Sequence, residues 1–282
     1  MIKKISIISF IALALWACTP KPLKIDLVQA PVKLAISTQI VPGQAIIVTV
    51  SKSFSALQQT DSNSLLSQFL VEHARVILTA NGTDFKLTKI APGIYGNLIG
   101  PNAPGTVFNL AVYDSTTGLS ITSQTKYYET VSIDSLWFDR IILVDDTNYF
   151  ANIRFVDPAG QNHYMINTYK NSDAFTRIDG SDILFDGNNG VRTTPVSDAI
   201  FTQALHTERV PLFNYKKGDT LTVTLSNISP DYYKYLVERN RARRNGLGTA
   251  LGEPVTLTTN IVGGYGFFTA IIPNIRRKVI TD

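Results

Sequence analysis

The chain of 282 residues contains one cysteine, three histidines and few charged residues. The single cysteine, Cys18, has no partner for an internal disulfide bond, and an exported protein needs a special reason to keep it unpaired. The histidines, His73, His163 and His206, show no His-Glu-x-x-His spacing, which argues against a zinc protease. Neither a Gly-x-Ser-x-Gly elbow nor a phosphate-binding loop followed by Lys-Ser/Thr occurs. These absences weigh against the common hydrolase and nucleotide-binding classes.

The balance of charge gives no argument for nucleic acid as a partner. The formal net charge is +4, and Lys3 and Lys4 supply two of these charges. Removal of residues 1–17, which contain no acid, lowers the charge to +2. With 44% hydrophobic residues the chain can bury a sizeable core, and its length suggests one or two domains.

The first 17 residues have the pattern of a secretory signal peptide. Lys3 and Lys4 precede an apolar run from Ile5 to Leu15, and the small residue Ala17 precedes Cys18. The apolar run is too short to span a bilayer comfortably, and a polar tail follows it. We therefore expect cleavage before Cys18.

Leu15-Trp16-Ala17-Cys18 resembles the lipobox of bacterial lipoproteins, in which the cysteine is acylated through its sulfur and becomes the first residue. More than one acyl chain on Cys18 would anchor the protein stably. The alternative is a free cysteine inside an ordinary signal peptide. Residues 18–23, with Pro20 and Pro22, predict a short extended tether. Thr19 in place of Asp implies delivery to the outer membrane, on either its periplasmic or its outer side.

Residues 24–130 predict an immunoglobulin-like or fibronectin-like β-sandwich, because short β-branched or alternating runs are separated by turn-forming residues. Asn81-Gly82 indicates a tight hairpin. Asn63 to His73 predicts one or two helical turns, with apolar residues on one face. The seven expected strands are Lys24–Val28, Lys33–Ile40, Ala45–Val50, Arg75–Ala80, Phe85–Ile90, Val107–Tyr113 and Leu119–Tyr128.

Residues 131–282 predict a second β-rich domain with one packed helix. Ser229 as N-cap and Pro230 at the first helical position predict a helix that runs to Arg244. The cluster Gly263-Gly264-Tyr265-Gly266 predicts a bulge or tight bend. The expected strands are Ser135–Leu143, Tyr149–Val156, His163–Tyr169, Ser181–Phe185 and Thr220–Leu225, with further apolar strands between Val255 and Ile280.

A set of short segments spread over nearly the whole chain carries a resemblance to a known family. The segments are the lipobox cysteine, Val41-Pro42-Gly43, Ala74 to Leu78, Pro92 to Tyr95, Phe155 to Gly160, Ser181 to Gly187, Ile228 to Tyr235 and Asn260 to Phe268. In these segments the chain resembles a lipoprotein family of Bacteroidota, the domain of unknown function 4249. The resemblance implies no catalytic residues. Members of the family commonly occur beside TonB-dependent outer-membrane receptors, which implies an accessory role in binding or import.

An oxygen-rich loop is the one candidate for a metal site. Asp182, Asp186, Asn188 and Asn189 lie around two glycines, and hard cations such as calcium prefer such oxygens. The complete calcium-loop pattern is absent, since no Glu follows at the required spacing. Asp, Asn and Gly are also ordinary turn formers, so the loop predicts either turn geometry alone or a calcium site.

Three aspartates offer a candidate acid and base for glycoside cleavage. Asp145-Asp146 and Asp157 could serve only if they faced one cleft at about 5 to 10 Å. The alternative is that Asp145 to Asn148 form the loop between two strands. Because no catalytic signature accompanies these residues, we expect a protein that is not an enzyme.

Basic and aromatic residues of the predicted helix are the remaining candidates for binding. Arg241 and Arg244 belong to the densest basic run, which could meet lipid phosphates or simply favour the helix dipole. Tyr232 and Tyr235 have core-like spacing, which leaves Tyr233 as the tyrosine expected to be exposed. The sequence thus predicts a lipid-anchored binding or assembly accessory without cofactor. A surface adhesion or envelope-structural module and a glycan-active enzyme are the alternatives.

Overall fold

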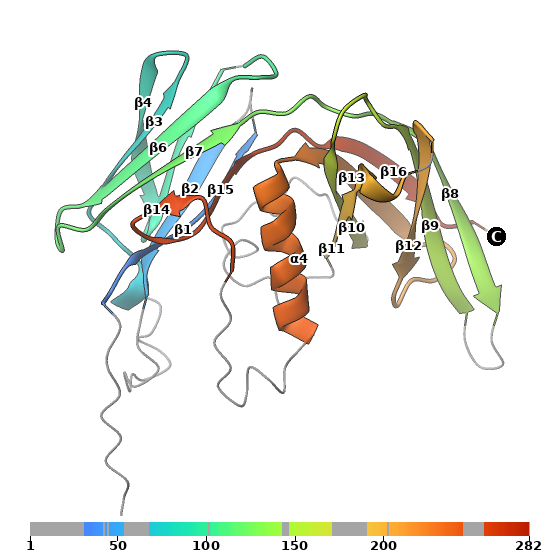
Figure 1. Ribbon diagram of the computed structural model, residues 1–282. Helices are drawn as coiled ribbons and strands as arrows, with labels where there is room; N and C mark the ends of the chain where they lie inside the picture. Colours follow the sequence, from blue (N-terminus) through green and yellow to red (C-terminus); the bar gives the residue numbers. More distant parts are fainter. Residues whose placement is uncertain are drawn as a thin grey trace, which may run out of the picture. The chain divides into compact units, whose positions relative to one another are not determined.

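The computed structural model describes residues 31–41, 43, 45–53, 68–100, 102–142, 147–170, 191–201, 203–244 and 257–281 (Figure 1). The described residues from Val32 onward belong to one compact unit. As predicted, this unit is mainly β, with a β-sandwich region followed by a second β-rich region that carries one packed helix.

Nine strands form the first sheet, in the order β14-β7-β6-β3-β4-β5-β2-β1-β15. Most neighbouring pairs are antiparallel. Six strands agree with the prediction within two residues at each end, namely β1, β2, β3, β4, β6 and β7. The prediction missed β5. The strands are β1 (Leu34–Val41), β2 (Ala45–Lys52), β3 (Ala74–Ala80), β4 (Thr83–Ala91), β5 (Ile94–Leu98), β6 (Val107–Asp114), β7 (Ser120–Lys126), β14 (Ile261–Val262) and β15 (Tyr265–Ala270).

Alternation of side chains explains why these segments are strands with one face in the core. In β6 every second residue, from Phe108 to Asp114, is buried, and the residues between them are exposed. Successive side chains of a strand point to opposite faces, so the apolar set gathers on one side. Val48, Leu78, Phe108 and Leu110 are at most 1% exposed within this core.

The Asn81-Gly82 turn has the predicted geometry. Both residues have positive φ angles, 51° and 76°, and they connect the directly paired residues Ala80 and Thr83. A two-residue turn of this kind twists in the same sense as the strands that it joins.

The chain returns to the first sheet near its end. β15 pairs in parallel with β1, and β14 pairs with β7. Gly266 has a φ of 104°, and a Cβ atom there would lie 1.7 Å from the carbonyl oxygen of Ile36. Glycine alone permits this close backbone approach. The bend predicted for the glycine cluster is confirmed at Gly263 and Gly264, which form the turn between β14 and β15, where Gly263 has a φ of 84°. A boundary at residue 130 therefore does not separate the two regions at this end of the chain.

The second region contains two smaller sheets, in the orders β12-β9-β8 and β11-β10-β13-β16. Phe155, Tyr164, Val223 and Leu225 are buried in their common core. The prediction found β8, β9, β10 and β13 but not β11 or β12. The strands are β8 (Ile133–Ile142), β9 (Thr147–Val156), β10 (His163–Lys170), β11 (Arg192–Ser197), β12 (Leu205–Leu212), β13 (Thr220–Ile228) and β16 (Asn274–Val279).

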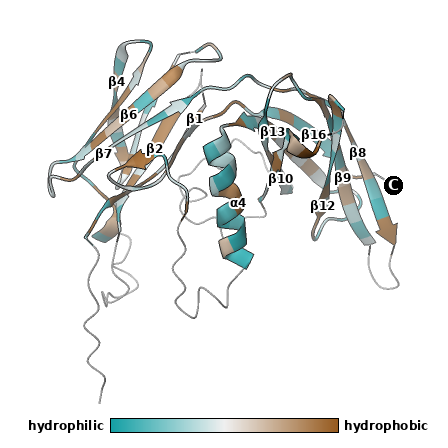
Figure 2. Ribbon diagram, in the orientation of Figure 1, coloured by the Kyte–Doolittle hydropathy of each residue, from teal (hydrophilic) through white to brown (hydrophobic). Residues whose placement is uncertain are grey.

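The helix α4 (Pro230–Arg244) begins as predicted at Ser229. The Ser229 hydroxyl accepts a hydrogen bond from the Tyr232 backbone N–H at 3.1 Å, which satisfies one of the free donors of the first turn. The helix is largely hydrophilic (Figure 2), and Leu236 is its one buried residue. It packs against β10 and β11, so tertiary packing of a narrow apolar stripe holds it in place.

Several predicted features lie outside the described residues. They include the strands Lys24–Val28 and Ser181–Phe185, the loop residues Asp145 and Asp146, and residues 63–67 of the helical segment expected over Asn63–His73. In the described remainder of that segment, Gln68 and Phe69 are helical. At the end of that segment, Leu70 forms an isolated bridge to Ser51. Thr147 and Asn148, expected in a loop, instead begin β9.

Candidate functional site

An open pocket of about 710 Å³ lies where β9 turns into β10. The η1 turn (Asp198–Ile200) and the stretch that leads into β12 form its other side. Small and apolar residues make up most of the lining, and two carboxylates add negative charge. The lining residues are Asp157, Pro158, Ala159, Gly160, Gln161, Asp198, Ala199, Phe201, Gln203 and Ala204.

The carboxylate of Asp157 is held by two donors of the protein. The hydroxyl of Tyr164 donates a short hydrogen bond to Asp157 Oδ1, and Asn162 Nδ2 donates to the same oxygen at 3.4 Å. Tyr164 is fully buried, and burial together with the bond to Asp157 raises the pKa of its hydroxyl strongly. The hydroxyl therefore stays protonated and keeps its role as a donor to Asp157.

Asp198 fastens the η1 turn to the β9–β10 turn. Its Oδ2 accepts a hydrogen bond from the backbone N–H of Asn162 at 2.5 Å. Its backbone N–H in turn donates to the carbonyl oxygen of Asn162 at 3.2 Å. The hydroxyl of Ser197 caps η1 by accepting from Ala199 N at 3.4 Å. Two turns that are distant in the sequence are thus tied together, and each contributes one carboxylate to the pocket.

Aromatic side chains support the pocket from beneath. Phe201 stacks on His206 with 3.5 Å between ring centroids, and it is nearly parallel to Tyr164 at 6.2 Å. Phe155 meets Tyr164 edge-on at 4.9 Å. Offset-stacked and edge-on pairs of this kind fix ring positions. The carboxylates therefore stand on a packed apolar base.

The β9–β10 turn is poorly arranged to hold a metal ion. Asn162 Nδ2 donates to the carbonyl oxygens of Pro158 (2.8 Å) and Gly160 (3.3 Å) as well as to Asp157. An amide nitrogen thus already engages three oxygens that a hard cation would need. The pocket suits a small polar ligand better than an ion, since its volume lies in the ordinary range for such ligands.

The structure gives Asp157 a different partner from the one imagined for glycoside cleavage. Asp145 and Asp146 lie outside the described residues, and Asp198 instead lines the same pocket as Asp157. Burial, the hydrogen bond to Asp157 and the negative charges of Asp157 and Asp198 all raise the pKa of the Tyr164 hydroxyl. Sequence reasoning missed Asp198, because nothing in Ser197-Asp198 distinguishes it from an ordinary turn.

The histidines occupy unrelated surroundings. His73 is exposed, whereas His163 is buried, and its burial lowers its pKa. His206 Nε2 lies 3.1 Å from Glu208 Oε2. Among the described residues, no three His, Cys, Asp or Glu side chains gather as a metal site. The calcium candidates Asp182, Asp186 and Asn188, together with Asn189, fall outside the described part, as does Cys18.

The binding candidates of α4 have different exposures. Tyr233 is half-buried and packs on the ring of His163 at 4.8 Å, which corrects the expectation that it is exposed. Tyr232 and Tyr235 pack on Phe267, as their spacing predicted. Arg241 and Arg244 are exposed. In the described part of the chain, no helix is both long enough and apolar enough to cross a membrane.

The resemblance found in the sequence is confirmed by a family model, the domain of unknown function DUF4249, which matches residues 20–272. Solved structures similar to the chain include the FN1–FN3 domains of chicken CNTN1, at 9% identity and a TM-score of 0.28. That match covers 69% of this chain and 60% of the other. The receptor tyrosine kinase Torso is similar at 12% identity and a TM-score of 0.22, over 72% and 71% of the two chains.

Salmonella alpha-2-macroglobulin is similar at 11% identity and a TM-score of 0.25, over 92% of this chain and 15% of its own. No curated protein sequence matches the chain. Because the family model spans most of the chain, the protein belongs to the DUF4249 family.

Proposed function

We propose that the mature chain is an outer-membrane lipoprotein, anchored through acylated Cys18, that acts as a non-enzymatic binding accessory to a TonB-dependent transporter. The anchor is supported by the basic, apolar and small-residue pattern before Cys18. The transporter link is supported by the family resemblance alone.

The pocket between Asp157 and Asp198 is the observation that carries the binding role. Tyr164 and Asn162 hold Asp157 Oδ1, and the Asn162 backbone holds Asp198 Oδ2. Carboxylates fixed by protein donors are suited to accept hydrogen bonds from a ligand. Among the described lining residues there is no serine, cysteine, lysine or histidine, so the two carboxylates are the groups there with the chemistry of a nucleophile or an acid and base.

The anchor is tested by growing cells with an alkyne-bearing fatty acid. We expect the label on the wild-type protein and none on Cys18→Ala. Label on both proteins would place the acyl chain elsewhere, and label on neither would remove the anchor from the proposal.

The accessory role is tested by affinity capture of the tagged protein from gently solubilised outer membranes, with Cys18→Ala as control. We expect a transporter-sized β-barrel to copurify with the lipidated form only. If nothing copurifies, the accessory role fails and a free-standing adhesion or envelope role replaces it. Turnover of glycans that is lost in Asp157→Asn would instead establish an enzyme.

A further inference from the structure

The pocket at the β9–β10 turn carries negative charge that no basic residue of its described lining balances. Asp157 and Asp198 are the charged residues of that lining, and it includes no lysine, arginine or histidine. In the part of the chain that the structure describes, neither carboxylate forms an ion pair with a lysine or arginine. Both residues are half-buried. A charge that is partly removed from water needs compensation by an opposite charge or by hydrogen bonds.

The histidines near the pocket do not supply the missing positive charge. Burial lowers the pKa of His163, and the nearby charge of Asp198 opposes this effect without reversing it. The His163 ring, which packs on Tyr233, therefore stays neutral at neutral pH. His206 Nε2 lies 3.1 Å from the carboxylate of Glu208, so a charge on its ring would be balanced there. Two negative charges thus remain at the pocket.

Each carboxylate offers one oxygen that no described donor of the protein uses. Tyr164 and the side-chain amide of Asn162 donate to Asp157 Oδ1, and the backbone N–H of Asn162 donates to Asp198 Oδ2. Among the described residues, no donor reaches Asp157 Oδ2 or Asp198 Oδ1. Asn162 ties together the two turns that carry these oxygens, so both acceptors are positioned before a ligand arrives. Such preorganisation lowers the entropic cost of binding.

The distribution of the available oxygens favours an ammonium group over a guanidinium group. A guanidinium binds a carboxylate best when two of its N–H groups meet both oxygens of that carboxylate. Neither Asp157 nor Asp198 can offer both oxygens, because one oxygen of each already accepts from the protein. An ammonium is a compact charge with three donors, and it can reach one oxygen on each of two carboxylates.

The remaining lining indicates what the ammonium is attached to. Pockets for small ligands combine an apolar lining with a few polar groups that fix the orientation of the ligand. The apolar part here consists of small side chains and one aromatic ring, which suit a short hydrocarbon body. Its residues are Pro158, Ala159, Ala199, Phe201 and Ala204.

We propose that the pocket binds a small organic ammonium. Its N–H groups donate to Asp157 Oδ2 and Asp198 Oδ1, and its apolar body lies against the alanines and Phe201. This inference names the ligand class of the pocket, and it rests on the binding role proposed above.

The test is a calorimetric titration of the full lipidated chain in detergent with benzylamine, which is protonated at neutral pH. Benzyl alcohol is the matched neutral probe, because it has nearly the same shape and no charge. Titration of each probe into detergent alone gives the blank. We expect benzylamine to bind at least tenfold more tightly than benzyl alcohol, and benzylguanidine to bind at least threefold more weakly than benzylamine.

Variants of the two aspartates locate the binding site. Asp157→Asn/Asp198→Asn removes both charges but keeps a side-chain oxygen that can accept from Tyr164 and Asn162. We expect at least a tenfold loss of affinity for benzylamine, with the affinity for benzyl alcohol within twofold of wild type. The milder variant Asp198→Asn should lose at least threefold. Asp139→Asn is the matched control, since it removes a charge of the same region at a side chain that is 47% exposed outside the pocket, and it should stay within twofold.

The outcomes separate this inference from the accessory role. If benzylamine binds no more tightly than benzyl alcohol, or if the aspartate variants bind it as wild type does, the ligand class is refuted even where a transporter is captured. If benzylamine binds as expected but no transporter is captured, the ligand class stands and the accessory role fails. Calcium binding that the double variant abolishes, without preferential binding of benzylamine, would replace the organic ammonium by a metal ion and overturn the inference.

Discussion

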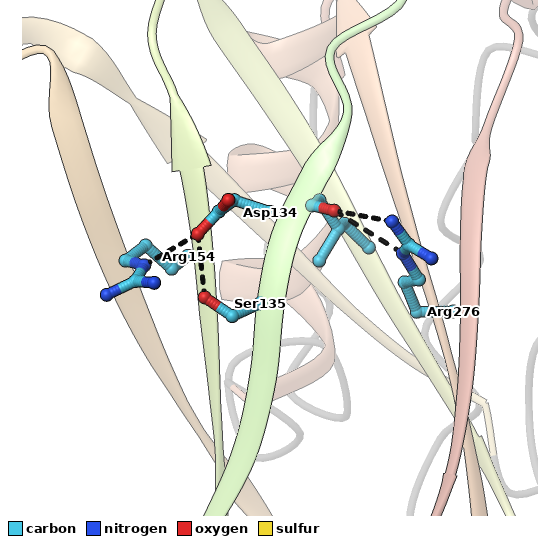
Figure 3. A network of polar contacts seen from close by, with 5 residues as sticks. Asp134, Ser135, Arg154 and Arg276 are labelled. Carbon is cyan, nitrogen blue, oxygen red and sulfur yellow. Dashed lines mark hydrogen bonds and ion pairs between the residues drawn. The ribbon is translucent and has the colours of Figure 1, made fainter.

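The edge strands of the nine-stranded sheet and those of the two smaller sheets are held by different kinds of contact. In the first sheet, β15 and β14 from the C-terminal part of the chain pair with β1 and β7. The side chain of Asn260 bridges to Phe268 and Gln124. In the second region, side chains of β16 reach β8: Arg276, labelled in Figure 3, donates to the Ile133 carbonyl oxygen at 3.2 Å.

This difference separates a region held mainly by backbone pairing from one that also carries the candidate pocket. Backbone ladders and the close approach of Gly266 to Ile36 leave the first sheet little freedom. The second region holds the pocket lined by Asp157 and Asp198. Buried side-chain polar atoms with no partner among the described residues occur in both regions, at Thr49 in the first sheet and at Asn152, Tyr215 and Ser226 in the second.

The largest effect is expected at the close contact of the first sheet. Gly266→Ala places a Cβ atom against the Ile36 carbonyl at a φ of 104°, which should lower the free energy of unfolding by about 3 kcal/mol or more. Urea denaturation measures this change. Gly82→Ala is the control, since its φ is also positive but nothing lies within 4 Å, and it should cost about 1 kcal/mol. Equal losses would contradict a special role for the β1–β15 approach.

Asn260 tests whether one side chain closes the first sheet. Its amide accepts from Phe268 N at 2.9 Å and donates to Phe268 O at 2.7 Å and Gln124 O at 3.1 Å. Asn260→Ala leaves these backbone groups unpaired, so we expect a loss of about 2 kcal/mol in urea denaturation. Asn109→Ala, at an exposed position of β6, should stay within about 0.5 kcal/mol. If Asn260→Ala lost no more stability than Asn109→Ala, the hydrogen bonds of the Asn260 side chain would be dispensable for the first sheet.

Two buried tyrosines of the second region sharpen the contrast between paired and unpaired hydroxyls. Tyr164→Phe removes a donor to Asp157 and should cost about 1 kcal/mol. Tyr215→Phe removes a buried hydroxyl with no partner among the described residues, so its cost should be near zero. Thermal melts at neutral pH distinguish the two. A larger loss for Tyr215→Phe would contradict its unpaired state.

Alkaline pH should weaken the wild-type fold through these same tyrosines. Burial raises the pKa of Tyr164 and of Tyr215 above the ordinary value of 10.0. The folded chain keeps these protons while the unfolded chain releases them, so the stability present below pH 10 is lost as pH rises above it. We expect urea titrations between about pH 9 and pH 11 to show a shallower decline in either Phe variant than in wild type. Parallel declines would contradict the raised pKa values.

The smallest effect is expected at the seam between β8 and β16. Lys278 Nζ donates to the Leu136 carbonyl oxygen at 2.7 Å from an exposed position. Lys278→Met should cost about 0.5 to 1 kcal/mol, because water can replace an exposed donor. Lys86→Met, exposed on β4, serves as control and should change little. If Lys278→Met lost more stability than Asn260→Ala, the β8–β16 contact would matter more to the fold than the Asn260 contacts of the first sheet, against our expectation.

The sequence pattern predicted some secondary-structure elements correctly and missed others. Ser229 and Pro230 located the start of α4, and Asn81-Gly82 located a hairpin, because caps and tight turns depend on local backbone chemistry. β11 and β12 were missed, since Arg192–Ser197 and Leu205–Leu212 contain proline and polar residues that follow no clear alternation. Their strand conformation is imposed by pairing with β10 and β9.

The candidate site was predicted only in part. Asp157 stood out as a carboxylate, but its partner in the pocket comes from Asp198, which lies 41 positions later and carries no motif. Tyr233 was misjudged because helical spacing does not reveal that the ring of His163 lies beside it. The shared pocket of Asp157 and Asp198 and the packing of Tyr233 on His163 both arise from segments that are distant in the sequence, and no local sequence pattern encodes such long-range contacts.

The sequence by itself determined the local features: the export signal pattern at Cys18, the alternation that makes strands, the caps and turns, and family membership. Tertiary structure alone decided that the chain returns to the first sheet, that Asp157 shares a pocket with Asp198, and that Trp137, Asn152 and Arg209 lie in one row. The reason is physical: propensity, capping and periodicity act over a few residues, whereas strand register is fixed by burial of entire faces against distant segments.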